Sequence, residues 1–408
     1  MRYWLWLMGF LATLSAWAEP IYEQEPINYY EAEAVDAVAR YFADGVNGWE
    51  HRGRPGFLVN FLEAFDIPKE SQVLVYSKTS LQVSHIRPEN PRAIYFNKDI
   101  YVGWVPGGDV LEISASSPTT GNNFYTIGGS GTQPELVRET HRCLRCHGGS
   151  FTRDIPSPLV RSVFPDADGQ PIFKAGTTVV DQTTPFEDRH GGWFASGGFS
   201  SHRANLIFQE TETGADEGSL FNWANIRDNG YPGQGSDLVA LLILEHQAEL
   251  HRLLAQMSLQ IQTALFRQRK FDELLGRTER LSESTQRQIK SVGDKVLQYM
   301  FFVDEAPLPE IDKAASPYAQ YFDGNGPKDS QGRSLYDLEL SGTLLKYPFS
   351  YMVYSDAFQN LPAEALEYLS SELRVILDPE FEHKGYEHLS RHDKLAIRQI
   401  LEETTDLL

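Results

Sequence analysis

The pattern of apolar and polar positions divides the chain into segments of different character. Apolar side chains recur with helical spacing over 28–43 and 56–65, which predicts two short helices. The segments that follow are rich in Val, Ile, Tyr and Phe, and turn residues separate them, so we expect antiparallel strands. These strands are predicted over 72–77, 92–97, 100–105, 110–114 and 123–127.

The next stretch has the composition of loops. Residues 148–235 contain 13 Gly and 6 Pro, which oppose long regular elements. Residues 236–305 contain two Gly and no Pro, and their apolar spacing is helical. We expect one helix that Ser236 caps and that runs toward Phe266. Further helices are predicted over 281–302, 363–377 and 391–403.

The first 18 residues have the pattern of an export signal. Arg2 precedes an apolar run that ends in Ala16-Trp17-Ala18, a small-x-small cleavage site. The run is shorter than the roughly 20 residues that a spanning helix needs. The sequence therefore predicts a cleaved signal peptide over 1–18, a periplasmic or otherwise exported bacterial protein, and no stable membrane span after cleavage. An uncleaved anchor is the alternative.

Composition and charge limit the classes of partner. The chain is 41% hydrophobic and 12% aromatic, as in globular proteins, and its formal net charge is -20. An acidic surface repels phosphate backbones and attracts basic proteins. We therefore expect no nucleic-acid partner and, for a redox protein, a partner that is basic.

Only two cysteines occur in 408 residues, and they form the sequence Cys143-Leu144-Arg145-Cys146-His147. The spacing C-x-x-C-H is typical of covalent c-type haem attachment. Cys143 and Cys146 would form thioethers with the haem, and His147 would be the proximal ligand of the iron. One motif predicts one haem c.

Two other interpretations of the motif have less support. A thioredoxin-like dithiol would open a long helix, whereas Gly148-Gly149 and then Pro156 and Pro158 follow this motif. A structural zinc site needs four ligands, and no second cysteine pair completes the set.

The ligand on the other side of the iron decides between carrier and catalyst, because a second His or Met favours electron transfer whereas a vacant position admits a small molecule. His246, on an apolar stripe of the predicted helix, is our first candidate, and His202 is the second. His190 comes third. Met257, the first methionine after the motif, follows His147 by 110 residues, which does not fit small cytochromes c.

Other side chains have candidate roles around the cofactor. The aromatic residues that could line the porphyrin are Trp193, Phe194, Phe199 and Trp223. The arginines that could pair with the haem propionates are Arg142, Arg145 and Arg153.

Several segments resemble a known family. RAIYFNKDIYVGWVPGGDVLEI, CLRCH, TTPFEDRHGGWF and LILEHQAELHRLL are similar to segments of large exported bacterial monohaem c-type cytochromes without an assigned reaction. The resemblance covers most of the chain after residue 18 and implies an exported location and a haem c. The Leu-Glu-His-Gln segment recurs in such relatives, which favours His246.

Together these features predict an α+β protein: short N-terminal helices and antiparallel strands, a Gly/Pro-rich haem-binding loop region and a predominantly helical C-terminal half. The expected regions after the signal are 19–140, 141–235 and 236–408, as separate domains or as one body around the haem. The favoured function is electron transfer to a redox partner protein. The alternatives are a peroxidase-like or other haem enzyme, with His202 or His190 as acid/base beside an open iron, and a haem-based sensor.

Overall fold

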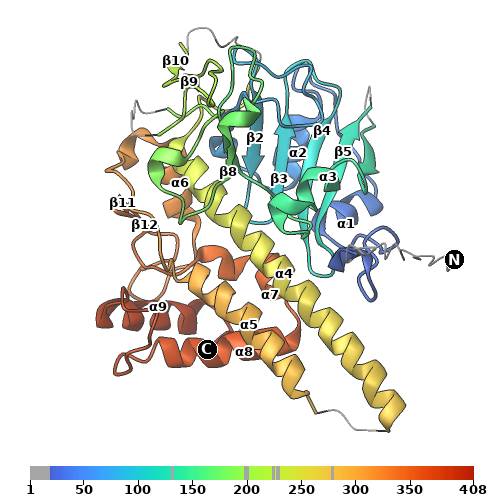
Figure 1. Ribbon diagram of the computed structural model, residues 1–408, viewed down its shortest axis with the longest axis vertical. Helices are drawn as coiled ribbons and strands as arrows, with labels where there is room; N and C mark the ends of the chain where they lie inside the picture. Colours follow the sequence, from blue (N-terminus) through green and yellow to red (C-terminus); the bar gives the residue numbers. More distant parts are fainter. Residues whose placement is uncertain (1–18, 130–132, 197–201, 223–225, 227–229, 277–279) are drawn as a thin grey trace, which may run out of the picture.

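The chain folds into an antiparallel sheet and a helical half, with one long helix between them (Figure 1). The computed structural model describes residues 19–129, 133–196, 202–222, 226, 230–276 and 280–408. This architecture confirms the predicted α+β class. The predicted signal peptide over 1–18 lies outside the described residues.

Six strands follow one another in the main sheet in chain order, and each pairs antiparallel with the next. Short turns between most of these strands favour such a meander, whereas the connection between the first two strands, over 76–91, is longer. The turn after β3 contains Gly107 at a φ of 80°, a value that glycine adopts without strain. The strands are β1 (Val73–Val75), β2 (Arg92–Phe96), β3 (Ile100–Trp104), β4 (Leu111–Ser117), β5 (Gly121–Gly128) and β6 (Glu135–Arg138).

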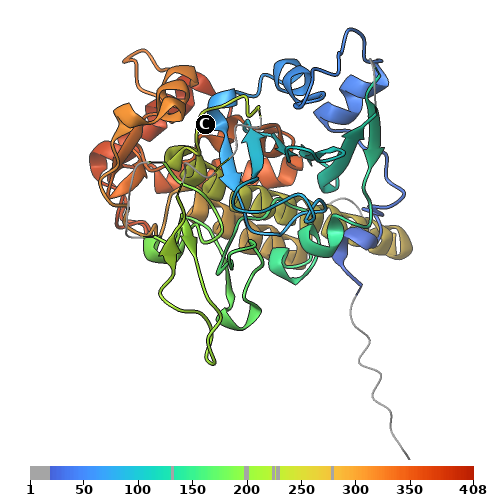
Figure 2. The ribbon, with the colours of Figure 1, turned by 90° about the horizontal axis from the view of Figure 1, so that it is seen from above.

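Two short helices cover one face of this sheet. α1 (Ala37–Ala43) and α2 (Leu58–Ala64) share a hydrophobic core with Val102 of β3 and Ile113 of β4. Figure 2 shows these blue helices on one side of the sheet and the green segment on the other. Burial of this face fixes the register, because a shift of one residue would expose every apolar side chain.

The opposite face of the sheet carries a mixed set of side chains. Ile94, Gly103 and Glu112 lie directly opposite one another on β2, β3 and β4. Val75 and Tyr101 belong to the same core cluster as the long helix α4 (Leu238–Leu275). This face and α4 therefore bound a common space.

The Gly/Pro-rich stretch forms mainly loops, as predicted. Its strands pair only in short ladders, β7 (Arg161–Val163) with β8 (Thr177–Val179) and β9 (Leu206–Ile207) with β10 (Ser219–Leu220). One loop residue, Trp193, bridges to Val75 at the edge of the main sheet. The loops are thereby attached to the sheet near its first strand.

The helix α4 begins one residue later than expected for a Ser236 cap. Asp237 is the cap, and its carboxylate accepts hydrogen bonds from the backbone N–H groups of Val239 and Ala240. Ser236 instead joins the loops to the sheet, because its hydroxyl donates to the Phe194 carbonyl and accepts from the Leu74 N–H.

The C-terminal half packs against α4 in one large core. In the described part of the chain, no helix combines the length and apolar character needed to cross a bilayer. The remaining elements are α5 (Glu283–Met300), α6 (Pro317–Asn325), β11 (Leu338–Ser341), β12 (Thr343–Leu345), α7 (Asp356–Gln359), α8 (Ala363–Ile376) and α9 (Arg391–Thr404).

Candidate functional site

The C-x-x-C-H motif folds into a single helical turn, α3 (Leu144–His147). The backbone N–H groups of Cys146 and His147 both donate to the Cys143 carbonyl, at 3.2 and 2.9 Å. Residues three and four positions apart share a face of a helix, so the two cysteines and the histidine face the same way. Leu144 does not line the same surface and is buried in a core cluster that includes Leu259.

The imidazole of His147 is oriented by the loop that follows it. Its Nδ1 lies 2.9 Å from the Ser157 carbonyl oxygen, and the Ser157 N–H donates to the His147 carbonyl. A carbonyl only accepts, so Nδ1 carries the proton and Nε2 keeps its lone pair. Metal-bound histidines commonly have such a second hydrogen bond. Burial also lowers the pKa of His147, which keeps the ring neutral.

The two cysteines are free thiols, not a disulfide. Burial, followed by the carboxylates of Glu139 and Glu112, raises the pKa of the Cys143 thiol to about 12. A redox dithiol needs a lowered thiol pKa, so this environment opposes the thioredoxin-like reading. Within the described ranges, no group of three or more His, Cys, Asp or Glu side chains is arranged to hold a metal ion. The zinc reading therefore gains no support.

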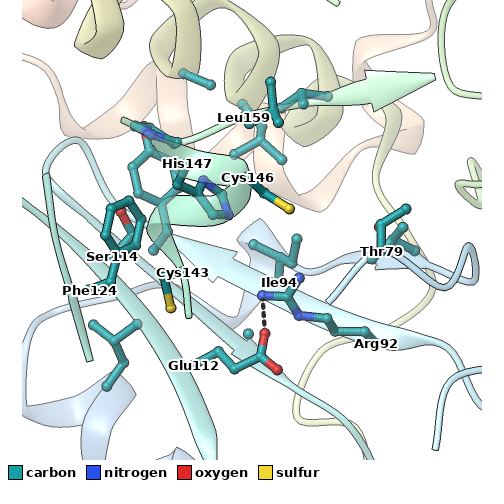
Figure 3. A pocket seen from close by; sticks show the side chains of 18 of the residues that line it. Thr79, Arg92, Ile94, Glu112, Ser114, Phe124, Cys143, Cys146, His147 and Leu159 are labelled. Carbon is teal, nitrogen blue, oxygen red and sulfur yellow. Dashed lines mark ion pairs between the residues drawn. The ribbon is translucent and has the colours of Figure 1, made fainter. Parts of the chain in front are cut away.

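All three motif side chains line one cavity between α3, the sheet and α4 (Figure 3). Its empty volume is about 1000 Å³, part of it open to solvent. The apolar residues of its wall are Val75, Ile94, Ile113, Phe124, Pro158, Leu159, Val160, Trp193, Leu244 and Ala248. A large, flat and mostly apolar group fits such a wall.

Two arginines and one carboxylate also line the cavity. Arg92 and Glu112 form an ion pair at 2.8 Å on the sheet face. Arg161 belongs to β7, and its guanidinium carbon lies 4.4 Å from the ring centre of Phe151, just after the motif. Arg161 thus lies on the motif's side of the cavity, whereas Arg92 lies on the sheet's side.

The structure places His246 outside this cavity, in the core between α4 and the C-terminal half. Its Nδ1 lies 2.6 Å from the Gln182 amide oxygen and therefore donates to it. Its Nε2 lies 2.7 Å from the Ser350 hydroxyl, which leaves that nitrogen to accept. Because both ring nitrogens are bonded to protein groups, this geometry does not support His246 as the distal ligand.

His202 and His190 also lie away from the cavity wall. Their rings contact each other at 5.0 Å in a buried cluster, and Nε2 of His190 lies 2.8 Å from a carboxylate oxygen of Glu245. Nδ1 of His202 accepts from the Ala204 N–H. The structure thus brings these two histidines together, but not to His147.

The remaining candidates are distributed as follows. Trp193 lines the cavity as expected, whereas Phe194 is in the core on the other face of the sheet, and Phe199 and Trp223 lie outside the described residues. None of the three arginines chosen from the sequence lines the cavity; these are Arg142, Arg145 and Arg153. Arg142 instead pairs with Glu139.

No second histidine and no methionine is among the described residues that line the cavity. All 11 histidines, and every methionine after residue 18, lie in the described part of the chain. Met257, Met300 and Met352 are fully buried in the helical core. The usual sixth ligands of a haem carrier are therefore absent from this wall.

Sequence reasoning missed Arg92, Glu112 and Tyr101, which the sheet brings to the cavity. The hydroxyl of Tyr101 lies 2.7 Å from Nδ1 of His251, on α4. A charged residue at the start of a strand and a glycine in the middle of the next one, Gly103, were the available signals. Their meaning depends on register, which the sequence alone does not give.

Comparisons of the chain with known protein families, with curated proteins and with solved structures found no match.

Proposed function

We propose that this chain is an exported monohaem c-type cytochrome that holds its haem in the cavity beside α3. The haem would be attached through Cys143 and Cys146, with Nε2 of His147 on the iron. One observation supports this proposal most strongly: the two thiols and an imidazole with a fixed tautomer line one mostly apolar cavity. Haem c, when bound, supplies one-electron and small-molecule redox chemistry.

The cavity wall favours an iron with an open sixth position. A saturated electron carrier needs a second strong ligand, and the described wall offers no histidine besides His147 and no methionine. We therefore place small-molecule redox chemistry at the iron ahead of simple electron transfer. Electrons would still come from a protein partner, and the formal charge of -20 fits a basic one.

Covalent attachment is tested by producing the full chain in a bacterium that matures c-type cytochromes. We expect haem that stays with the polypeptide after denaturation, and an intact mass equal to residues 19–408 plus one haem. Cys143→Ser combined with Cys146→Ser removes both thioether bonds, so its denatured chain carries no haem.

A matched control is Cys146→Ser alone, which leaves one thioether and keeps haem on the chain in lower yield. Wild-type protein that leaves the maturing host without covalent haem contradicts the proposal. An unprocessed N-terminus would contradict the proposed signal peptide alone.

A further inference from the structure

Arg92 and Glu112 form a polar group on the floor of the cavity, on the side opposite His147 (Figure 3). Arg92 lies on β2 and Glu112 on β4, and β3 runs between them. The ion pair therefore extends across β3. Nothing in the sequence places these two residues, 20 positions apart, on one surface.

A glycine in β3 makes this crossing possible. Gly103 lies directly opposite Ile94 on β2 and Glu112 on β4. A Cβ built on Gly103 would overlap the guanidinium of Arg92. Glycine weakens a strand interior and commonly marks the close approach of another group. Here that group is the side chain of Arg92, held flat against the strand.

The carboxylate of Glu112 is fixed from its other side as well. Its second oxygen accepts a hydrogen bond from the Gln82 amide at 3.1 Å, and the same amide donates to the Val110 carbonyl at 3.1 Å. The guanidinium is thus held by a carboxylate that is itself anchored. Its Nε is buried and has no hydrogen-bond partner within the described part of the chain. Arg92 thus lines the cavity while one N–H of its guanidinium has no protein partner among the described residues, and an unpaired charged donor is costly.

We infer that Arg92 binds a small anion seated on the open side of the iron. This rests on the haem proposed above, with His147 on one side and Arg92 on the other. The ligand class is a compact anion with an oxygen, nitrogen or fluorine acceptor, because Arg92 is the cation on the sheet's side of a mostly apolar cavity, whereas Arg161 lies on the motif's side. A charge-assisted hydrogen bond from Arg92 stabilises such a ligand, and it discriminates against neutral diatomic molecules that accept hydrogen bonds poorly.

A haem propionate is the other anion that could pair with Arg92. A propionate and an added anion would both accept hydrogen bonds from the guanidinium, but they predict different effects of substituting Arg92. If a propionate pairs with Arg92, a substitution of Arg92 changes the haem itself, and the affinities of all iron ligands should change alike. An added anion as partner makes the effect of Arg92 specific to anions.

The test is an equilibrium titration of the purified holoprotein, ferric with azide and fluoride, and ferrous with carbon monoxide. We expect Arg92→Leu to weaken azide and fluoride binding about tenfold or more, the loss of one charge-assisted hydrogen bond. Carbon monoxide affinity should change much less. Glu112→Gln should change azide affinity in the opposite direction. It removes the negative charge that pairs with Arg92, so azide should bind more tightly.

Arg161→Leu is the matched control, because Arg161 lines the same cavity from the motif's side. It should leave the ratio of azide to carbon monoxide affinity unchanged. The inference is overturned by equal effects of Arg92→Leu on azide and carbon monoxide, by an equal loss in Arg161→Leu, or by holoprotein that binds no azide. Wild-type protein without covalent haem would instead refute the proposed function, and the haem content of each sample separates the two failures.

Discussion

The two nitrogens of a histidine ring decide what the residue can do, and His147 and His246 differ in this respect. One nitrogen of His147 donates to the Ser157 carbonyl, and the ring lines the cavity. Both nitrogens of His246 are bonded, to Gln182 and to Ser350, and the ring stacks on Phe302 at 4.6 Å. The arrangement of His147 fits the proposed role as iron ligand, whereas that of His246 is typical of a buried packing residue.

His246→Ala tests this assignment. The substitution leaves a buried amide and a hydroxyl without their partner and opens a hole beside Phe302, so we expect the free energy of unfolding to fall by about 3 kcal/mol. The visible spectrum of the proposed haem should stay unchanged, because His246 does not line the cavity. Urea unfolding and absorption spectra measure the two effects.

Ser350→Ala is the companion variant for His246→Ala. It removes one of the two hydrogen bonds of His246 and also the bond that the Ser350 hydroxyl accepts from the Met352 N–H, so it should cost about 2 kcal/mol. A changed haem spectrum in His246→Ala, with little loss of stability, would restore His246 as an iron ligand and contradict the assignment.

At the scale of elements, α3 shows why so short a helix suffices. The four residues of the helix and its N-cap Cys143 place two thiols and an imidazole on one face, and Leu144 anchors the turn in a core with Phe124 and Leu259. The hydrogen bonds between His147 and Ser157 close the loop that follows. The turn needs no long helix, which agrees with the glycines and prolines that follow the motif.

The sequence pattern predicted five of the six strands of the main sheet and the long helices, because their apolar periodicity is strong. β2, β3 and α5 lie within a residue or two of the predicted ranges. The pattern missed β6 (Glu135–Arg138), an edge strand without buried side chains, and α6 (Pro317–Asn325), a short helix that starts with proline. Both are elements whose signal is weak because little of them is buried, or because they are short.

The candidate site was predictable only where its residues are adjacent in sequence. Cys143, Cys146 and His147 are carried by one motif, and the structure places them on one wall. Arg92 and Glu112 come together through strand pairing across Gly103, and no local pattern encodes that register. His246 was chosen for its apolar stripe, but a residue on such a stripe is buried by packing as readily as by a cofactor.

At the scale of the whole molecule, α4 connects the two halves. Leu244 and Ala248 line the cavity, while other residues of the same helix, Met257 among them, are buried in the helical core. Figure 1 shows α4 between the sheet and the orange and red helices. Because α4 packs against both the sheet and the C-terminal helices, we expect the two halves to unfold together.

Buried neutral histidines make this joint stability depend on pH. Burial lowers the pKa of His202, His246 and His251 to about 3 in the folded chain. In the unfolded chain the pKa of histidine is about 6.5. Below pH 6.5 the unfolded chain therefore binds protons that the folded chain does not, and stability falls as the pH falls toward 3.

Urea unfolding at pH 7, 6 and 5 measures this dependence. We expect the free energy of unfolding to decrease toward low pH, with a slope that approaches about 1.4 kcal/mol per pH unit for each of these histidines. His246→Ala should make the slope shallower by one such contribution. Stability that stays constant between pH 7 and 5 would contradict the burial of neutral imidazoles.

The central claim is a covalent haem with His147 on one side of the iron and no protein ligand on the other. The most direct measurement is the absorption spectrum of the purified, reduced holoprotein before and after the addition of carbon monoxide. We predict a high-spin spectrum that shifts at once to that of a carbon monoxide complex, because the described residues of the cavity wall include no second histidine and no methionine for the proposed haem. A low-spin spectrum that carbon monoxide does not change would contradict the claim and identify the protein as a carrier with two iron ligands.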